Sequence, residues 1–231
     1  MTSWSMHPRA AFDLETTGKD PREARIVTAS IVLVDHGGTV VERFEWLADP
    51  GVDIPEEAAA IHGITTAHAQ ANGQFADVVA AEVAAVLAVL FAHGIPVIAF
   101  NASYDFTVLA HEARRHQLEQ ITPAPVIDPF ICHKKMEKYR KGSRTLVALC
   151  EEYAIDLMDA HTSAADAEAT LRLADALAAK HSALRADVTE LHATQVEWAR
   201  EQAADFQEYL RRTKDPAAVV EGDWPVLPPR S

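Results

Sequence analysis

The 231-residue sequence predicts an α/β fold with one mixed central sheet and helices on both of its faces. Strand-like segments dominate the first 50 residues, and from about residue 75 helical and strand-like segments alternate. The length suits one domain, or one domain with a modest extension, that can bury a full core. Cys132 and Cys150 form no CxxC pair, so we expect both to be small buried side chains in a reducing compartment.

The first strands are predicted from apolar runs and turn signals. Residues 10–14 form a short core strand that ends at acidic residues. Residues 26–35 are rich in alternating β-branched side chains, and a turn signal at residues 36–38 leads to another strand at residues 40–47. The last two strands should therefore form a hairpin.

Helix signals follow along the chain. A short helix is expected between Pro55 and Gly63, with acidic residues in its first turn, where the helix dipole favours them. Asp128 and Pro129 are a typical pair of N-cap and first helical residue. Further helices are predicted at residues 75–92, 103–116, 145–153, 163–180 and 184–212, further strands at 95–100 and 125–127, and an extended proline-rich tail at 216–231.

Charge and hydropathy exclude some classes of protein. The formal net charge of −13 argues against a general binder of long duplex nucleic acid, which would carry a basic surface. Residues 83–100 contain no Asp, Glu, Lys or Arg, but Gly94 and Pro96 interrupt them, which favours a buried helix, a turn and a strand over a membrane span. Residues 1–9 show no secretory signal. We therefore expect a cytoplasmic protein that has no membrane association.

Three short segments contain acidic residues and one histidine in an order that indicates a metal site. They are FDLETTG at residues 12–18, NASYDF at residues 101–106 and HTSAAD at residues 161–166. Carboxylates are suitable ligands for Mg²⁺ or Mn²⁺. Two such ions can stabilise the attacking and leaving oxygens of a phosphodiester, and a neutral histidine can take a proton from the attacking water.

The first segment gives the strongest single signal. Asp13 and Glu15 occupy alternate positions of a strand, so both side chains project from the same face. They repel each other unless a positive charge lies between them. Asp105, in the first turn of a helix, has an ordinary structural explanation by itself. The same holds for Asp166, because Ser163-x-x-Asp166 resembles a capping box with Ser163 as the N-cap. Their joint occurrence favours the metal site.

These segments resemble the motifs of the DEDDh 3′–5′ exonucleases, the family that contains the proofreading epsilon subunit of bacterial DNA polymerase III. Asp13 and Glu15 match the acids of the first motif, and Asp105 matches the acid of the second. His161 and Asp166 match the third motif, and the histidine indicates the histidine rather than the tyrosine subgroup. The sequence IHGIT at residues 61–65 also resembles a segment that recurs between the first two motifs, and the resemblance covers about residues 9–180.

The resemblance implies an RNase H-like sheet with the site across the end of the first strand. Asp13, Glu15 and Asp166 would hold one of two Mg²⁺ or Mn²⁺ ions. Asp13 would also contact the other ion, with Asp105 acting directly or through water. His161 would deprotonate the attacking water, so that nucleoside 5′-monophosphates leave from single-stranded 3′ ends. Weaker candidates for binding the terminal nucleotide are Leu14, Thr16, Thr17, His62 and Asn101.

Three other functions deserve comparison. An exoribonuclease that trims short RNA would use the same residues. A non-catalytic nucleic-acid-binding or scaffold module is disfavoured because every expected catalytic residue is present. A haloacid-dehalogenase-type phosphatase would need aspartate at the position of Glu15.

The predicted organisation is an exonuclease domain at residues 1–181, a helical extension at 182–215 and a proline-rich tail at 216–231. The aromatic stretch from Trp198 to Tyr209 is expected to pack on the domain rather than bind a partner. Association with a polymerase cannot be predicted from the sequence.

Overall fold

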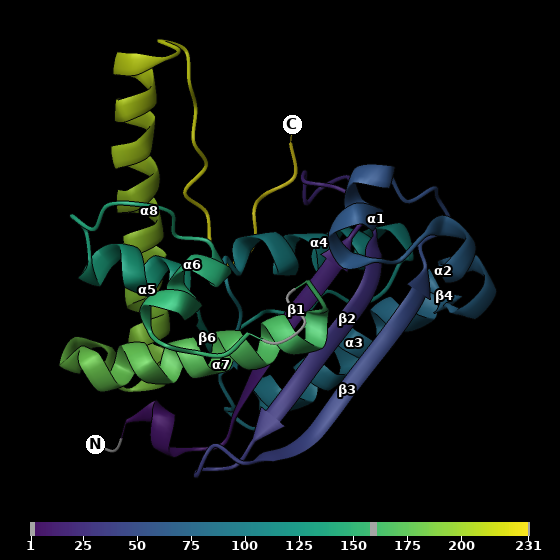
Figure 1. The fold of residues 1–231 in the computed structure, drawn as a ribbon, viewed down its shortest axis with the longest axis horizontal. Helices are drawn as coiled ribbons and strands as arrows, with labels where there is room; N and C mark the ends of the chain where they lie inside the picture. The colour runs from purple at the N-terminus through teal and green to yellow at the C-terminus, as the bar shows by residue number, and fades with distance from the viewer. Residues whose placement is uncertain (1–2, 158–160, 231) are drawn as a thin grey trace.

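The computed structural model describes residues 3–157 and 161–230. Its centre is a six-stranded sheet with the strand order β4-β3-β2-β1-β5-β6 (Figure 1). The strands β1, β2 and β3 form an antiparallel meander, whereas β5 and β6 continue the sheet in parallel on the other side of β1. The strands are β1 (Arg9–Thr16), β2 (Ile26–Val34), β3 (Val40–Asp49), β4 (Gln74–Phe75), β5 (Val97–Ile98) and β6 (Val126–Ile127).

Helices cover both faces of this sheet, so the predicted mixed α/β fold is confirmed. The helices are α1 (Glu56–His62), α2 (Thr66–Asn72), α3 (Ala76–Ala92), α4 (Ser103–Arg115), α5 (Pro129–Met136), α6 (Leu146–Glu152), α7 (Ser163–Lys180) and α8 (Val188–Thr213), with 3₁₀ turns at Trp4–Met6 and Ser182–Arg185. The short elements α2 and β4 were not predicted. Thr65 caps α2 by accepting a hydrogen bond from the N–H of His68.

The alternation of side chains along β1 separates two hydrophobic cores. Phe12 and Leu14 point to one face, where they pack with residues of α3 and α4. Ala11 points to the other face and belongs to the core that includes residues of α7. Figure 1 shows α7 in green, crossing one face of the sheet, with α3 on the opposite side. Asp13 and Glu15 share the face of Ala11, so they point toward α7.

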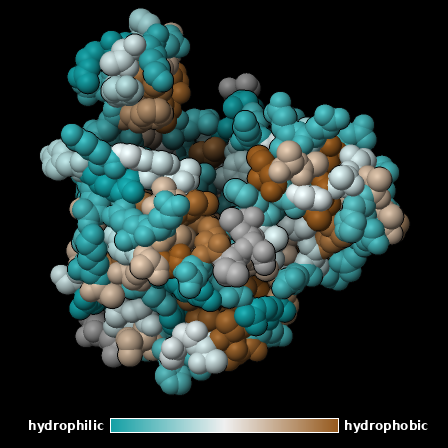
Figure 2. Space-filling view, in the orientation of Figure 1, coloured by the Kyte–Doolittle hydropathy of each residue, from teal (hydrophilic) through white to brown (hydrophobic). Residues whose placement is uncertain are grey.

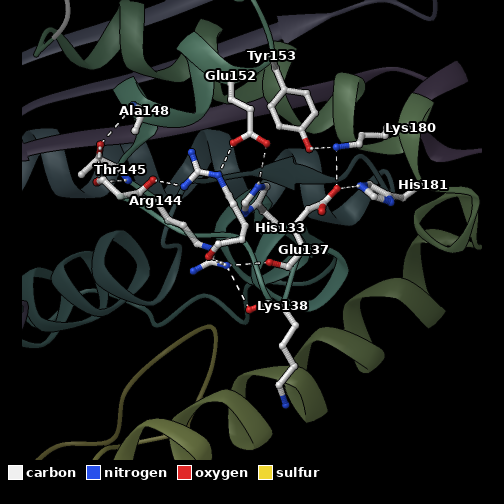
Figure 3. A network of polar contacts seen from close by, with 12 residues as sticks. His133, Glu137, Lys138, Arg144, Thr145, Ala148, Glu152, Tyr153, Lys180 and His181 are labelled. Atoms are coloured by element: carbon white, nitrogen blue, oxygen red, sulfur yellow. Dashed lines mark hydrogen bonds and ion pairs between the residues drawn. The ribbon is translucent and has the colours of Figure 1, made fainter. Parts of the chain in front are cut away.

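Polar contacts hold α7 in place along its length. Near its middle, the buried Arg9 of β1 donates a hydrogen bond of 2.9 Å from Nε to Oδ1 of Asp175. At its C-terminal end, Nζ of Lys180 lies 2.7 Å from Oε1 of Glu137, just beyond α5. Figure 3 shows that this pair belongs to a larger network in which the Tyr153 hydroxyl also contacts Lys180. The helix is therefore fixed both to the sheet and to its neighbouring helices.

The helix α8 packs against the sheet edge with its first half. The side-chain amide of Gln195 donates to the carbonyl of Val126 at 3.0 Å and accepts from the N–H of Asp128 at 2.7 Å. Trp198 is partly buried against both cores, as predicted, whereas Phe206 and Tyr209 are exposed. Figure 1 shows the second half of α8 projecting from the body.

Residues 216–230 of the C-terminal tail contain neither helix nor strand, and they pack back onto the body. Trp224 is buried, and its indole N–H donates to Oδ2 of Asp128 at 3.3 Å. The N–H of Leu227 donates to the hydroxyl of Thr107 in α4 at 2.8 Å. The guanidinium of Arg22 donates to the carbonyl of Pro228 at 2.8 Å. The tail thus joins α4 to the loop that follows β1.

Two predictions about buried residues are confirmed. Cys132 and Cys150 are both buried and unpaired. Residues 83–100 form the end of α3, a turn and the short strand β5. Within the described parts of the chain, no helix combines the length and the apolar character that a membrane crossing requires.

Candidate active site

The end of β1 contributes two carboxylates to one face of the sheet. In the register with β2, Asp13 lies opposite Ser30 and Glu15 lies opposite Thr28. Burial raises the pKa of Asp13 well above its ordinary value, and the nearby acids Asp105, Asp166 and Glu15 raise it further. Burial, and then Asp166, raises the pKa of Glu15 to about 7.

The helix α4 brings Asp105 beside this strand. Asp105 is 4% exposed, and its Oδ1 accepts a hydrogen bond of 3.1 Å from the N–H of Leu14. Burial raises the pKa of Asp105 well above its ordinary range, although hydrogen bonds from its own N–H and that of Leu14 oppose this shift. The second segment is thus joined directly to the first.

The turn that enters α4 depends on Asp128, which accepts hydrogen bonds from the N–H groups of Asn101 at 3.0 Å and Ala102 at 2.9 Å. Asp128 also caps α5, as predicted. Burial raises the pKa of Asp128 to about 6, while these backbone donors oppose the rise. Its role in the turn was not predicted, because a cap pattern reports only the local helix start. Asn101 itself has a φ of 59°, an uncommon conformation for a residue other than glycine.

The third segment lies at the start of α7. Ligand atoms of Glu15, His161 and Asp166 all lie within 4.8 Å of one another. The N–H of His161 donates to Oδ1 of Asp166 at 3.4 Å, and His161 has a φ of 72°. Burial raises the pKa of Asp166, whereas this N–H and the charge of His161 oppose the rise. His161 is exposed, so solvent reaches the imidazole.

The prediction that Ser163 caps α7 was wrong. Thr162 is the N-cap, and its hydroxyl accepts from the N–H of Ala165 at 3.4 Å. Ser163 is instead the first helical residue, and its buried side chain faces β2. The two adjacent hydroxyl residues offer the same local pattern, and only the packing of α7 on the sheet distinguishes them.

The donor set fits a divalent cation. The carboxylates of Asp13, Glu15, Asp105 and Asp166 come from three elements, and each has a raised pKa. A cluster of partly buried carboxylates is costly unless protons or cations neutralise it. Oxygen ligands of this kind suit Mg²⁺ or Mn²⁺.

The residues suggested for binding the terminal nucleotide occupy different positions. Leu14 is buried in the core. The Thr16 hydroxyl contacts the Tyr104 hydroxyl and donates to the carbonyl of Gly18 at 3.0 Å, and the Thr17 hydroxyl accepts from the N–H of Arg25 at 3.0 Å. Both threonine hydroxyls therefore hold the loop after β1.

A pocket of about 340 Å³ lies beside the carboxylates. Glu15, His62 and His161 line it, together with Glu45 and Leu47 of β3, which were not predicted because nothing in the local pattern marks them. Burial lowers the pKa of His62, and its Nδ1 accepts from the N–H of Ile64 at 3.2 Å. Figure 2 shows a hollow on this face between the lobe of α1 and α2 and the rest of the molecule.

The sequence model of an exonuclease family, RNase T, matches residues 10–174. The chain belongs to this exonuclease family. The match spans all three acidic segments and confirms the predicted resemblance. Membership of the family implies dependence on a divalent metal ion.

Similar solved structures share the fold. Exonuclease I of E. coli, in complex with a dA16 oligonucleotide, has a TM-score of 0.67 and 19% identity, and the match covers 77% of this chain and 42% of that one. Exonuclease I from Methylocaldum szegediense has a TM-score of 0.66 and 20% identity, with coverage of 86% and 45%. The RNase H-like architecture is therefore confirmed.

Curated relatives are much longer proteins. The PolC-type DNA polymerase III of Lacticaseibacillus paracasei is 29% identical over 159 residues, which are 69% of this chain and 10% of that protein. The same polymerase of Halalkalibacterium halodurans is 31% identical over 161 residues, again 69% of this chain and 10% of that protein. This chain thus spans about a tenth of the length of these polymerases.

Proposed function

We propose that this protein is a metal-dependent 3′–5′ exonuclease that removes nucleoside 5′-monophosphates from the 3′ ends of single-stranded DNA. One observation carries the proposal: carboxylates from β1, α4 and α7 converge. Asp105 accepts a hydrogen bond from the N–H of Leu14, next to Asp13, and ligand atoms of Asp166 and Glu15 lie within 4.8 Å of each other. Bringing acidic side chains from three distant regions together in a partly buried place does not stabilise the fold, because the carboxylates repel one another. A phosphodiesterase has a chemical reason to bring them together.

Two Mg²⁺ or Mn²⁺ ions are the proposed cofactors. Asp13, Glu15 and Asp166 would hold one ion, and Asp13 and Asp105 would hold the other. Bound there, the ions would stabilise the negative charge that develops on the scissile phosphate. The hydrogen bond from Leu14 keeps one oxygen of Asp105 oriented beside β1, which leaves the other available for a ligand.

His161 is the proposed general base. Its imidazole is exposed and lies next to Glu15 and Asp166, so that a water bound at the carboxylates could pass a proton to it. Since Thr16 and Thr17 use their hydroxyls within the loop, that loop would meet the terminal nucleotide mainly through its backbone. His62 and the pocket of about 340 Å³ would accommodate the nucleotide. Asn101, the further candidate for binding it, lines a different pocket together with Asp128 and Trp224.

The nature of the relatives supports DNA over RNA as substrate. Solved structures of exonuclease I contain dA16 and dT13 oligonucleotides, and the curated relatives are DNA polymerases. The net charge of −13 leaves little surface to hold duplex phosphates. A paired 3′ end would also have to unstack at a cost of a few kcal/mol. A cytoplasmic location and the division of the chain at residues 181 and 215 remain predictions.

Degradation of labelled oligonucleotides tests this proposal. A 5′-labelled single strand of DNA should yield a descending ladder of products with Mn²⁺ or Mg²⁺. The same strand in a blunt-ended duplex should be degraded more slowly. Excess EDTA should abolish degradation of both substrates. A circular single strand should survive. Parallel reactions with RNA test the alternative function, because an exoribonuclease would degrade the RNA strand faster than the DNA strand. Cleavage of the circle, or release of a 5′-terminal mononucleotide at the earliest times, would contradict the assignment.

A further inference from the structure

Three hydroxyl side chains join the start of α7 to β2. The Thr28 hydroxyl donates to Oγ of Ser163 at 3.1 Å, and the Ser30 hydroxyl lies 2.8 Å from the same oxygen. Ser30 is 1% exposed and Ser163 is 5% exposed. We call these three residues the hydroxyl cluster.

The cluster occupies the place where strand β2 passes the carboxylates. Thr28 lies opposite Glu15 and Ser30 lies opposite Asp13 in the register between the two strands. Ser163 belongs to the first turn of α7, two residues after His161 and three before Asp166. Residues three apart on a helix lie on neighbouring positions of its surface. The hydroxyls therefore connect the strand beside one pair of acids to the helix turn that carries the other groups.

Farther along β2, apolar side chains take part in the contact with α7. Val32 and Val34 lie on the same face of β2 as Thr28 and Ser30, and they pack in the core formed with α7. Burying a hydroxyl group stabilises a protein no more than burying an apolar side chain, and it is costly unless the hydroxyl forms a hydrogen bond. Hydrogen bonds, however, are directional and fix an orientation, whereas apolar contacts tolerate sliding. Along β2, hydroxyl residues replace valine beside Asp13 and Glu15, where the positions of the proposed metal ligands have to be accurate.

We propose that Thr28, Ser30 and Ser163 are positioning residues that hold Asp166 and His161 at the correct place relative to Asp13 and Glu15. This inference rests on the proposed function, because it assigns the cluster to the metal site of that reaction. All three residues line the pocket of about 340 Å³, but their hydroxyls bond to one another, and the proposed role requires no contact with the metal or the substrate. The hydroxyls would act indirectly, by fixing the position of the first turn of α7 relative to β2.

A matched pair of substitutions at Thr28 separates the hydroxyl from the shape of the side chain. Thr28→Val keeps the shape and removes the donor, whereas Thr28→Ser keeps the donor and removes a methyl group. Mn²⁺ affinity, measured by calorimetry, should fall roughly 10-fold in Thr28→Val and stay close to wild type in Thr28→Ser. Thr28 lines the pocket proposed for the terminal nucleotide, but valine keeps the shape of its side chain there. At saturating Mn²⁺, kcat of Thr28→Val should therefore fall by a similar factor, with KM nearly unchanged.

Substitutions of the serines test whether the hydroxyls act as a unit. Ser30→Ala and Ser163→Ala should each weaken Mn²⁺ binding, and the double variant should be no worse than Ser163→Ala alone, since both remove the same bond. Additive losses would contradict the cluster. Because Ser163 is buried and its variant could fail to fold, the pair at partly exposed Thr28 decides the question independently.

A control variant should leave the site unaffected. Ser5→Ala breaks a similar pair of hydroxyls, in which Oγ of Ser3 lies 3.0 Å from Oγ of Ser5. This pair lies at the 3₁₀ turn before β1, at the opposite end of that strand from Glu15. It should change neither Mn²⁺ affinity nor kcat. The positioning role is overturned if Thr28→Val and Ser163→Ala lower only the melting temperature, while Mn²⁺ affinity and kcat at a temperature where all variants are folded match wild type.

The measurement also separates this inference from the proposed function. If the wild-type protein binds Mn²⁺ but degrades no oligonucleotide, the exonuclease proposal fails and the affinities still decide the role of the cluster. If the wild type binds no Mn²⁺, both proposals are overturned.

Discussion

The backbone N–H of Leu14 donates a hydrogen bond of 3.1 Å to Oδ1 of Asp105, across 91 residues of sequence. This bond ties the helix α4 to the strand that carries Asp13 and Glu15. It also means that Asp105 has two separable roles, one as a hydrogen-bond acceptor and one as a charge. Substitutions can remove one role and keep the other.

Asp105→Asn should abolish metal-dependent activity while leaving the metal-free fold at least as stable as wild type. The amide oxygen still accepts from Leu14, and the loss of charge relieves the repulsion with the neighbouring acids. Asp105→Ala should instead lower the free energy of unfolding by about 1–3 kcal/mol, because the N–H of Leu14 loses its partner. Urea unfolding of both variants, without metal, measures the difference. Equal stability of the two variants would show that the bond contributes little.

The metal-free protein should become less stable as the pH rises through the range from about 4 to 7. Glu15 has its pKa raised from 4.5 to about 7, and Asp13 and Asp105 are also raised, so the folded state binds more protons than the unfolded state in this range. Stability is therefore highest below the ordinary carboxyl pKa and is lost as the pH passes through the raised values. Thermal unfolding between pH 4.5 and 8 in EDTA measures this, and Glu15→Gln should flatten the profile.

The stabilisation by Mn²⁺ should have the opposite dependence on pH. Protons and cations compete for the same carboxylates, so the rise in melting temperature on adding Mn²⁺ should be larger at pH 7.5 than at pH 5. A rise that does not depend on pH would mean that the ion binds elsewhere. The variant Asp49→Asn, which changes an acid outside the site, serves as the control.

His161→Ala should lower kcat by roughly 10²–10⁴-fold if the imidazole is the general base. Mn²⁺ affinity should then stay near the wild-type value. Because a nitrogen of His161 lies within 4.8 Å of the ligand atoms of Glu15 and Asp166, the imidazole could alternatively bind an ion directly. Calorimetry with Mn²⁺ separates the two roles, since a large loss of affinity would assign His161 as a ligand rather than a base.

Trp224→Ala should destabilise the protein by about 3–5 kcal/mol, as expected for removal of a large buried aromatic side chain. The tail contributes this residue to the core beside His192, where the ring centroids are 5.0 Å apart. Trp224→Phe keeps most of the packing and loses only the hydrogen bond from the indole N–H to Asp128. It should therefore lower the free energy of unfolding less than Trp224→Ala does. Urea unfolding compares the two. An unchanged free energy of unfolding in Trp224→Ala would show that the tail does not pack in solution.

Local patterns were sufficient for most of the secondary structure and for the residue types of the site. The spacing of Asp13 and Glu15 places both carboxylates on one face wherever β1 lies, because side chains alternate along any strand. Gly63 ends α1 in the left-handed conformation, and Asp128 caps α5, because caps depend on the backbone within a few residues. The strands β5 and β6 are shorter than predicted, since apolar runs continue beyond the two residues that pair.

Tertiary structure decided how these pieces meet. Two contacts join segments that are distant in the sequence. Asp105 contacts Leu14 across about 90 residues, and Asp166 lies close to Glu15 across about 150 residues. No local propensity specifies contacts over such separations. The choice between Thr162 and Ser163 as the cap of α7 had the same cause, because packing on β2 directs one hydroxyl to the backbone and the other to the sheet. The sequence by itself determined which chemical groups are present and which face of each element bears them. The relative placement of those faces, and hence the geometry of the site, follows from long-range packing.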